Sequence, residues 1–198
     1  MQARYVHARQ EVNPNTKKPY TFSGLEIPEI QNIPWLLELR EFKVYGNNDP
    51  GPNALPGLRS GGTPARRGWF AYYNIRISME DLYILYGSLA AFKAAWNEKS
   101  AIANQGNPIP LDIIGLTDLP PLSLRVLTNG GKVGIQGDTW IASKFFPLRR
   151  LGAADGQPDT FAWEKSARVF VCKRGWSVDH VRQLITAAAA GRVRVALA

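Results

Sequence analysis

The chain has 198 residues, of which 45% are hydrophobic and 20% are charged, so it can form a core and is too apolar for a disordered chain. Its single cysteine, Cys172, excludes a disulfide framework and a cysteine-based zinc site. The formal net charge of +8 favours a polyanionic partner such as nucleic acid, although a basic protein without such a partner has the same composition.

The first 20 residues contain no apolar segment of the kind that forms a secretory signal. The longest uncharged stretch with helical character, residues 82–92, would cover about 16 Å of a bilayer core of ~30 Å. We therefore expect a cytoplasmic protein, or one inside a particle assembled in the cytoplasm, with no membrane partner.

Residues 1–34 are polar and interrupted by prolines, which predicts an extended N-terminal arm ahead of a single domain that spans residues 35–198. Residues 35–46, "WLLELREFKVYG", are expected to form a strand with a β-bulge at Arg40 and Glu41. A helix is the competing interpretation of this segment.

Residues 46–68 are rich in glycine and proline and have no apolar periodicity, which predicts a long loop with little to bury. One acidic residue, Asp49, stands there against Arg59, Arg66 and Arg67. We expect this loop to be mobile and its arginines to contact phosphates.

Residues 69–77, "WFAYYNIRI", predict a strand that enters a helix at about 79–97, capped by Ser78. Alternation places Phe70, Tyr72 and Arg76 on the face opposite the core. Such a face suits bases stacking on the two rings while the arginine meets phosphate. A strand covered on both faces would have the same pattern.

Further along the chain we expect a hairpin on either side of "NGGK", a strand at 138–146, a loop at 147–160 and a strand at 167–173. A second helix is predicted at 178–190, capped by Ser177, and an alternating strand at 192–198. Two helices among mostly β segments indicate an α+β fold with a largely antiparallel sheet.

Basic residues gather near the C-terminus, where residues 165–198 hold seven Lys and Arg against one Asp. The predicted nucleic-acid site combines these with the central stretch: Arg59, Arg66, Arg67, Phe70, Tyr72, Arg76, Lys173, Arg174, Arg192 and Arg194.

No catalytic motif, metal-ligand spacing or phosphate-binding loop stands out, so we expect no metal and no cofactor. The leading hypothesis is a non-catalytic protein that binds single-stranded DNA or RNA. A structural subunit of a multiprotein particle, which could itself hold nucleic acid, is the alternative, and protein partners or a homo-oligomer fit either hypothesis. A metal-independent ribonuclease that uses His7 or His180 is the third.

Overall fold

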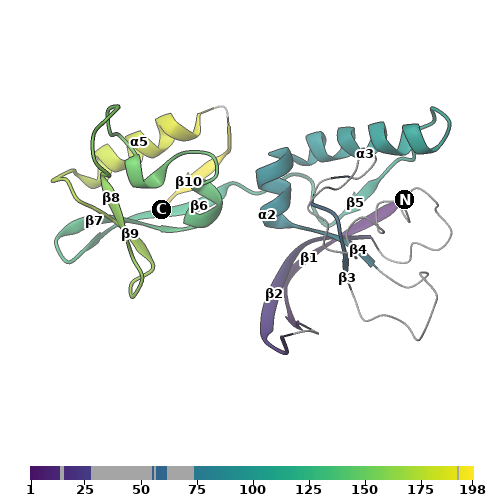
Figure 1. Ribbon diagram of the computed structural model, residues 1–198, viewed down its shortest axis with the longest axis horizontal. Helices are drawn as coiled ribbons and strands as arrows, with labels where there is room; N and C mark the ends of the chain where they lie inside the picture. The colour runs from purple at the N-terminus through teal and green to yellow at the C-terminus, as the bar shows by residue number, and fades with distance from the viewer. Residues whose placement is uncertain (14–15, 28–54, 56, 62–73, 191) are drawn as a thin grey trace. The chain divides into compact units, whose positions relative to one another are not determined.

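The computed structural model describes residues 1–13, 16–27, 55, 57–61, 74–190 and 192–198. The chain divides into two compact units, an N-terminal unit, Met1–Leu119, and a C-terminal unit, Pro120–Ala198. Each unit combines helices with its own five-stranded sheet (Figure 1). The predicted α+β class is therefore confirmed, with two sheets instead of one.

The sheet of the N-terminal unit has the strand order β3-β4-β2-β1-β5, and its pairs are antiparallel except β1 with β5. Its first two strands lie within the segment we expected to be a separate extended arm, so the observed division of the chain differs from the predicted one. The strands are β1 (Gln2–Val12), β2 (Pro19–Ile27), β3 (Arg59–Gly61), β4 (Asn74–Ser78) and β5 (Asp112–Ile114).

A β-bulge interrupts β1 between Val6 and Arg9, where Ala8 has a φ of 49°. The extra residue switches which side chains point to which face of the sheet. As a result Arg9 and Glu11 lie on the same face as Glu26 in β2.

The helical segment after β4 begins as predicted, because the Ser78 side chain accepts a hydrogen bond from the Asp81 amide. It is not one helix, however. Gly87, with a φ of 71°, ends the first part, and Ser88 caps a new helix that runs beyond the predicted end. The parts are α2 (Met79–Asp81), a π-helical turn η2 (Leu82–Tyr86) and α3 (Leu89–Ala103).

Helix α3 lies over one face of the first sheet (Figure 1). Its Phe92 and Trp96 are fully buried, as is Ile77 from β4. The segment we expected to be a loop with little to bury contributes Leu55 and Leu58, which are also buried, and its residues 59–61 form β3. Leu85, within the π-helical turn η2, is exposed.

The sheet of the C-terminal unit has the order β10-β6-β7-β9-β8, antiparallel except for the pair β10 with β6. The predicted hairpin is confirmed as β6 and β7. Gly130 and Gly131 form its two-residue turn with φ angles of 55° and 75°, both of which glycine adopts readily. The strands are β6 (Leu122–Asn129), β7 (Lys132–Gly137), β8 (Phe161–Glu164), β9 (Val169–Cys172) and β10 (Val195–Leu197).

The prediction of a strand at 138–146 is wrong, because Thr139–Ala142 form the short helix α4. Thr139, Ala142 and Phe146 are buried, and their spacing of three and four residues is helical. A short 3₁₀ helix, η3 (Leu148–Arg150), follows.

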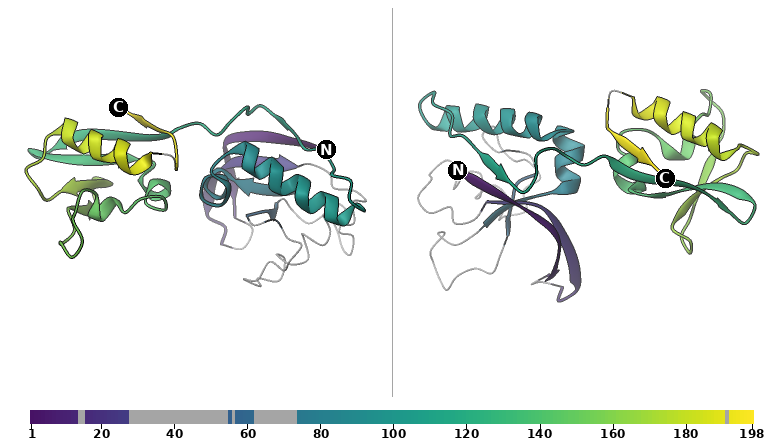
Figure 2. Two further views of the ribbon diagram at one scale, coloured as in Figure 1. Left: turned by 90° about the horizontal axis from the view of Figure 1, so that it is seen from above. Right: turned by 180° about the vertical axis from the view of Figure 1, so that it is seen from behind.

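Helix α5 (Val178–Ala189) matches the second predicted helix, and Ser177 accepts a hydrogen bond from the His180 amide as its cap. The helix lies along one face of the second sheet (Figure 2). Its Val181 and Ile185 are fully buried, as are Leu124 and Ile135 of the sheet.

The strand predicted at 35–46, most of the loop predicted at 46–68 and residues 69–73 lie outside the described residues. Within the described ranges, no helix is both long enough and apolar enough to cross a membrane.

Candidate functional site

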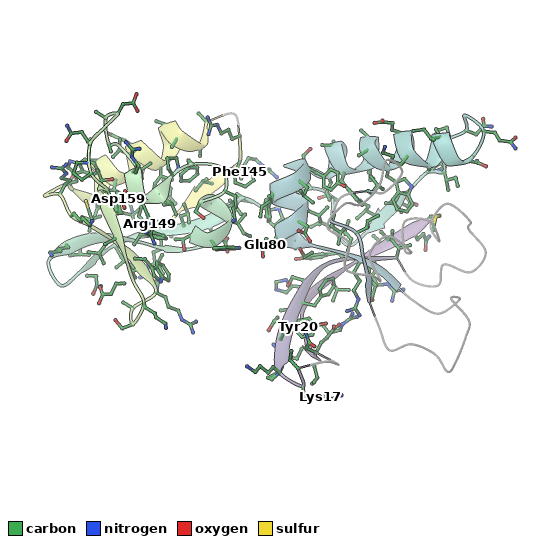
Figure 3. All side chains as sticks on the ribbon, viewed as in Figure 1. Lys17, Tyr20, Glu80, Phe145, Arg149 and Asp159 are labelled. Atoms are coloured by element: carbon green, nitrogen blue, oxygen red, sulfur yellow. The ribbon has the colours of Figure 1, made fainter. Side chains whose placement is uncertain are left out.

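Arg76, predicted to meet phosphate, instead lies in a cluster of paired charges on the first sheet. Its guanidinium is 2.8 Å from both Glu11 and Glu26, and Arg9 binds the same two carboxylates at 2.7 and 2.9 Å. Tyr20, near the tip of the β1–β2 hairpin (Figure 3), donates a hydrogen bond to Glu11. We call these five residues the paired-charge cluster.

The protonation of this cluster follows from its contacts. Burial alone would raise the pKa of Glu11, but hydrogen bonds from Tyr20, Arg76 and Arg9 lower it. Burial likewise opposes the charge of Arg76, and the two carboxylates outweigh it and raise that pKa. Two arginines therefore balance two glutamates, and the Arg76 side chain is only 13% exposed. This leaves Arg76 poorly placed for an external polyanion.

The other predicted site residues fall into different places. Arg66, Arg67, Phe70 and Tyr72 lie outside the described residues. The backbone of Arg59 belongs to β3, where it pairs in register with Arg76.

The C-terminal candidates all lie in the C-terminal unit. Lys173 and Arg174 are exposed directly after β9. The strand predicted at 192–198 is shorter than expected, so Arg192 and Arg194 precede β10 instead of alternating along it. The Arg192 guanidinium donates a hydrogen bond of 2.6 Å to the carbonyl of Phe145.

Positive charge is concentrated in the C-terminal unit. Residues 120–198 hold twelve Lys and Arg against five Asp and Glu, a formal charge of +7 out of the +8 of the whole chain. The N-terminal unit holds twelve basic and eleven acidic residues and is nearly neutral. The electrostatic attraction for a polyanion therefore belongs to the C-terminal unit.

This unit also contains a groove of about 520 Å³, a size suited to a small ligand such as a nucleotide. We call it the aromatic groove, because three of the residues that line it carry large rings. Its lining includes Trp140, Trp163, Phe170, Arg149, Arg150 and Asp159.

One wall of the groove comes from the hairpin of β8 and β9. Trp163 and Phe170 are direct partners in the antiparallel register, and their ring centroids are 4.9 Å apart. They share a sheet face with Phe161 and Cys172, which are buried. Trp163 is 40% exposed, so Trp163 and Phe170 extend the buried face of the sheet to the protein surface, where a ligand can contact the rings.

Helix α4 supplies the third ring. Trp140 is 62% exposed, which is unusual for a side chain of this size. The ammonium group of Lys144 lies 4.2 Å from the centre of its ring, a cation–π contact. A positive charge therefore accompanies this ring.

Thr160 holds the segments of the groove together. It is 2% exposed, and its hydroxyl donates to the carbonyl of Leu151, at 2.7 Å, and lies 3.2 Å from the carbonyl of Arg149. Its amide also donates to the Arg149 carbonyl, at 2.8 Å. These bonds attach η3, which carries Arg149 and Arg150, to the strand that begins one residue after Thr160.

The charged side chains of the groove differ in what they contact. Arg149 is exposed, and among the described residues no acceptor contacts its guanidinium. Arg150 donates one long hydrogen bond, of 3.4 Å, to the Ala154 carbonyl. Asp159 is half-buried, and among the described residues it is the one carboxylate that lines the groove.

Sequence reasoning missed this groove, because its lining comes from segments we expected to be a strand at 138–146, a loop at 147–160 and a strand at 167–173, while the segment that carries Trp163 was assigned no element. A signal was present in "TWIASKFFPLRR", residues 139–150. Read as a helix followed by a turn, this segment places Trp140 and Lys144 four residues apart on one face and directs Trp140 away from the buried positions.

The described residues contain no group of three or more His, Cys, Asp or Glu side chains arranged to hold a metal ion. His7 and His180 lie in different units, His7 beside the Tyr5 hydroxyl and His180 against the Trp176 ring. No family model matches the chain, and neither does any curated protein or solved structure.

Proposed function

We propose that this chain binds single-stranded nucleic acid, DNA or RNA, without catalysis, and that the aromatic groove of the C-terminal unit is the contact surface. The observation that carries the proposal is the presence of Trp140, Trp163 and Phe170 beside two arginines in the unit that holds nearly all of the net charge. Unpaired bases stack on aromatic rings, and phosphates bind arginine and lysine.

Loss of a ring and loss of an arginine should affect binding differently. Fluorescence anisotropy distinguishes the two effects when labelled single-stranded DNA, single-stranded RNA and duplex are titrated at several salt concentrations. Trp163→Ala should weaken binding of single strands by roughly 1–3 kcal/mol without changing the salt dependence, because it removes a stacking surface and no charge. Trp163→Phe, which keeps a ring, is the matched control. Thermal unfolding of each variant shows whether the fold is intact.

The double variant R149A/R150A should flatten the slope of log affinity against log salt by up to about 1.4, the value for two phosphate contacts on a single strand. The variant R125A/K132A removes the same charge at exposed positions outside the groove and should change binding less. Equal effects of the two double variants would mean that charge acts without a defined site.

The Gly-rich stretch with Arg66, Arg67, Phe70 and Tyr72 remains a second proposed contact. R66A/R67A removes two charges as R149A/R150A does, so comparing the two variants locates the site. If no oligonucleotide binds, the nucleic-acid proposal fails and the assembly-subunit hypothesis replaces it. If the wild type binds and every variant binds like it, neither the groove nor the Gly-rich stretch is the contact surface. Shortening of the RNA during the titration would instead favour the ribonuclease hypothesis.

A further inference from the structure

The aromatic groove has one feature that general binding of single strands does not require. Asp159, a carboxylate, lines it together with the rings and the arginines. A negative charge repels phosphate, so its presence within a basic unit calls for a ligand group that it would attract. That group must be a hydrogen-bond donor, because an ionised carboxylate only accepts.

The backbone that carries this carboxylate is attached to the backbone that carries a cation. Asp159 directly precedes Thr160, whose amide donates to the carbonyl of Arg149 and whose hydroxyl donates to that of Leu151. The acid and the arginine therefore enter the groove from two segments joined by these hydrogen bonds (Figure 3). A nucleotide likewise carries a base with donors at one end and a phosphate at the other.

We infer that the groove selects guanine, with the two oxygens of Asp159 accepting the N1–H and the exocyclic amino group of the base. This rests on the proposed function. Guanine has two adjacent donors on its Watson–Crick edge, whereas adenine and cytosine each place an acceptor next to their amino group and uracil places its one N–H between two carbonyls. A carboxylate pairs with two parallel donors in a bidentate contact, and it repels a carbonyl or ring nitrogen.

The rings complete the recognition. The stacked base lies against Trp163, Phe170 or Trp140, which contact any base equally well, so the rings give affinity and the carboxylate gives preference. Arg149 and Arg150 bind the phosphate on either side of the selected base.

The test uses the full chain and fluorescein-labelled octanucleotides of uridine that carry a single guanosine, adenosine or cytidine at the fourth position, together with the plain uridine octamer. A single guanosine avoids four-stranded structures. We expect the guanosine oligonucleotide to bind about tenfold more tightly than the other three, the discrimination typical of one bidentate contact to a base.

Asp159→Asn should reduce this preference to less than about twofold, because an amide offers one acceptor and opposes the second donor of guanine with its own. Its affinity for all four oligonucleotides should rise as a negative charge is lost. Asp155→Asn removes the same charge from an exposed position outside the groove, and it should keep the preference.

Two results would overturn the selection of guanine and leave the proposed function standing. In the first, the wild type binds all four oligonucleotides with equal affinity, and Trp163→Ala weakens that binding. In the second, Asp155→Asn loses the preference for guanine as Asp159→Asn does. Absence of binding to every oligonucleotide would overturn the proposed function itself.

Discussion

Tyr86, at the end of the π-helical turn, has its hydroxyl group in partly buried surroundings. Its ring packs edge-on against Phe92, with centroids 5.2 Å apart. Burial raises the pKa of Tyr86 to about 12, and the negative charge of Asp81 contributes in the same direction. The neutral hydroxyl is therefore favoured in the folded state.

This shift predicts a loss of stability in alkali. Below pH 10 the hydroxyl is protonated in both states, and between pH 10 and 12 it ionises first in the unfolded chain, so the free energy of unfolding falls as the pH rises through that window. Tyr86→Phe should remove about 1–3 kcal/mol of this loss, measured by urea unfolding at pH 8 and at pH 11.5. Tyr5→Phe is the control, and an equally steep loss in both variants would contradict the prediction.

Arg76 and Ala8 show how far single residues could be predicted. The alternation in residues 69–77 correctly separated Arg76 from the core residue Ile77. It could not show that carboxylates from two other strands face that arginine, because their alignment depends on the bulge at Ala8 and on strand pairing across fifty or more residues. The ion-pair partner of a charged residue in a strand can be identified only once the register of the sheet is known.

Among the elements, the junction of η3 with β8 determines the shape of the groove. Thr160 is the buried residue that links them, and the Lys173 amide in turn donates to the Thr160 carbonyl, at 2.8 Å. Three segments of the C-terminal unit therefore meet at one residue.

Thr160→Val keeps the shape of the side chain and removes its hydroxyl, which leaves the Leu151 carbonyl without this donor. We expect a loss of about 1–3 kcal/mol in unfolding free energy, because a buried carbonyl is left unsatisfied, together with weaker binding of single strands, because the segment that carries Arg149 and Arg150 loses one of its attachments to Thr160. Urea unfolding and anisotropy titration measure the two effects. Thr128→Val, at an exposed position in β6, should change neither, and unaltered binding by a destabilised Thr160→Val would show that the junction does not position the groove.

Elements were predicted best where a local signal decides them. The caps Ser78 and Ser177 and the glycine pair of the hairpin act within four residues, and these were placed correctly, whereas the cap at Ser88 was not predicted. Residues 138–146 were assigned the wrong element, because a nine-residue segment of mixed apolar and polar residues fits a strand as well as a helix until the buried positions are known. The groove combines several segments, so the local signal in residues 139–150 could indicate an exposed Trp140 beside Lys144 but could not bring Trp163 and Phe170 next to it.

At the scale of the whole molecule, the division into two units went unpredicted because Pro120 and Pro121 were the only break in composition at the boundary, without a linker. Each unit nevertheless has its own sheet and its own buried residues. Those of the C-terminal unit include Leu122, Ile135 and Ile185.

This organisation predicts that residues 120–198 fold alone. We expect the fragment to unfold cooperatively in urea, with a free energy on the order of 5 kcal/mol, and to bind single-stranded oligonucleotides within about threefold of the full chain, because it retains the groove and the +7 charge. Circular dichroism and anisotropy provide the measurements. Residues 1–119, with a charge of +1, are the comparison, and tighter binding by that fragment would move the site to the Gly-rich stretch.

In the C-terminal unit the basic residues are dispersed, whereas the aromatic rings are clustered in the groove. This difference has a kinetic consequence for the proposed binding. Most of its basic residues lie outside the groove, so they act on an approaching strand over the Debye length of about 8 Å at physiological ionic strength and set the rate of encounter. Trp140, Trp163 and Phe170 act only after contact and set how long the strand stays. A rise in salt should therefore slow the formation of complexes more than it shortens the lifetime of each one.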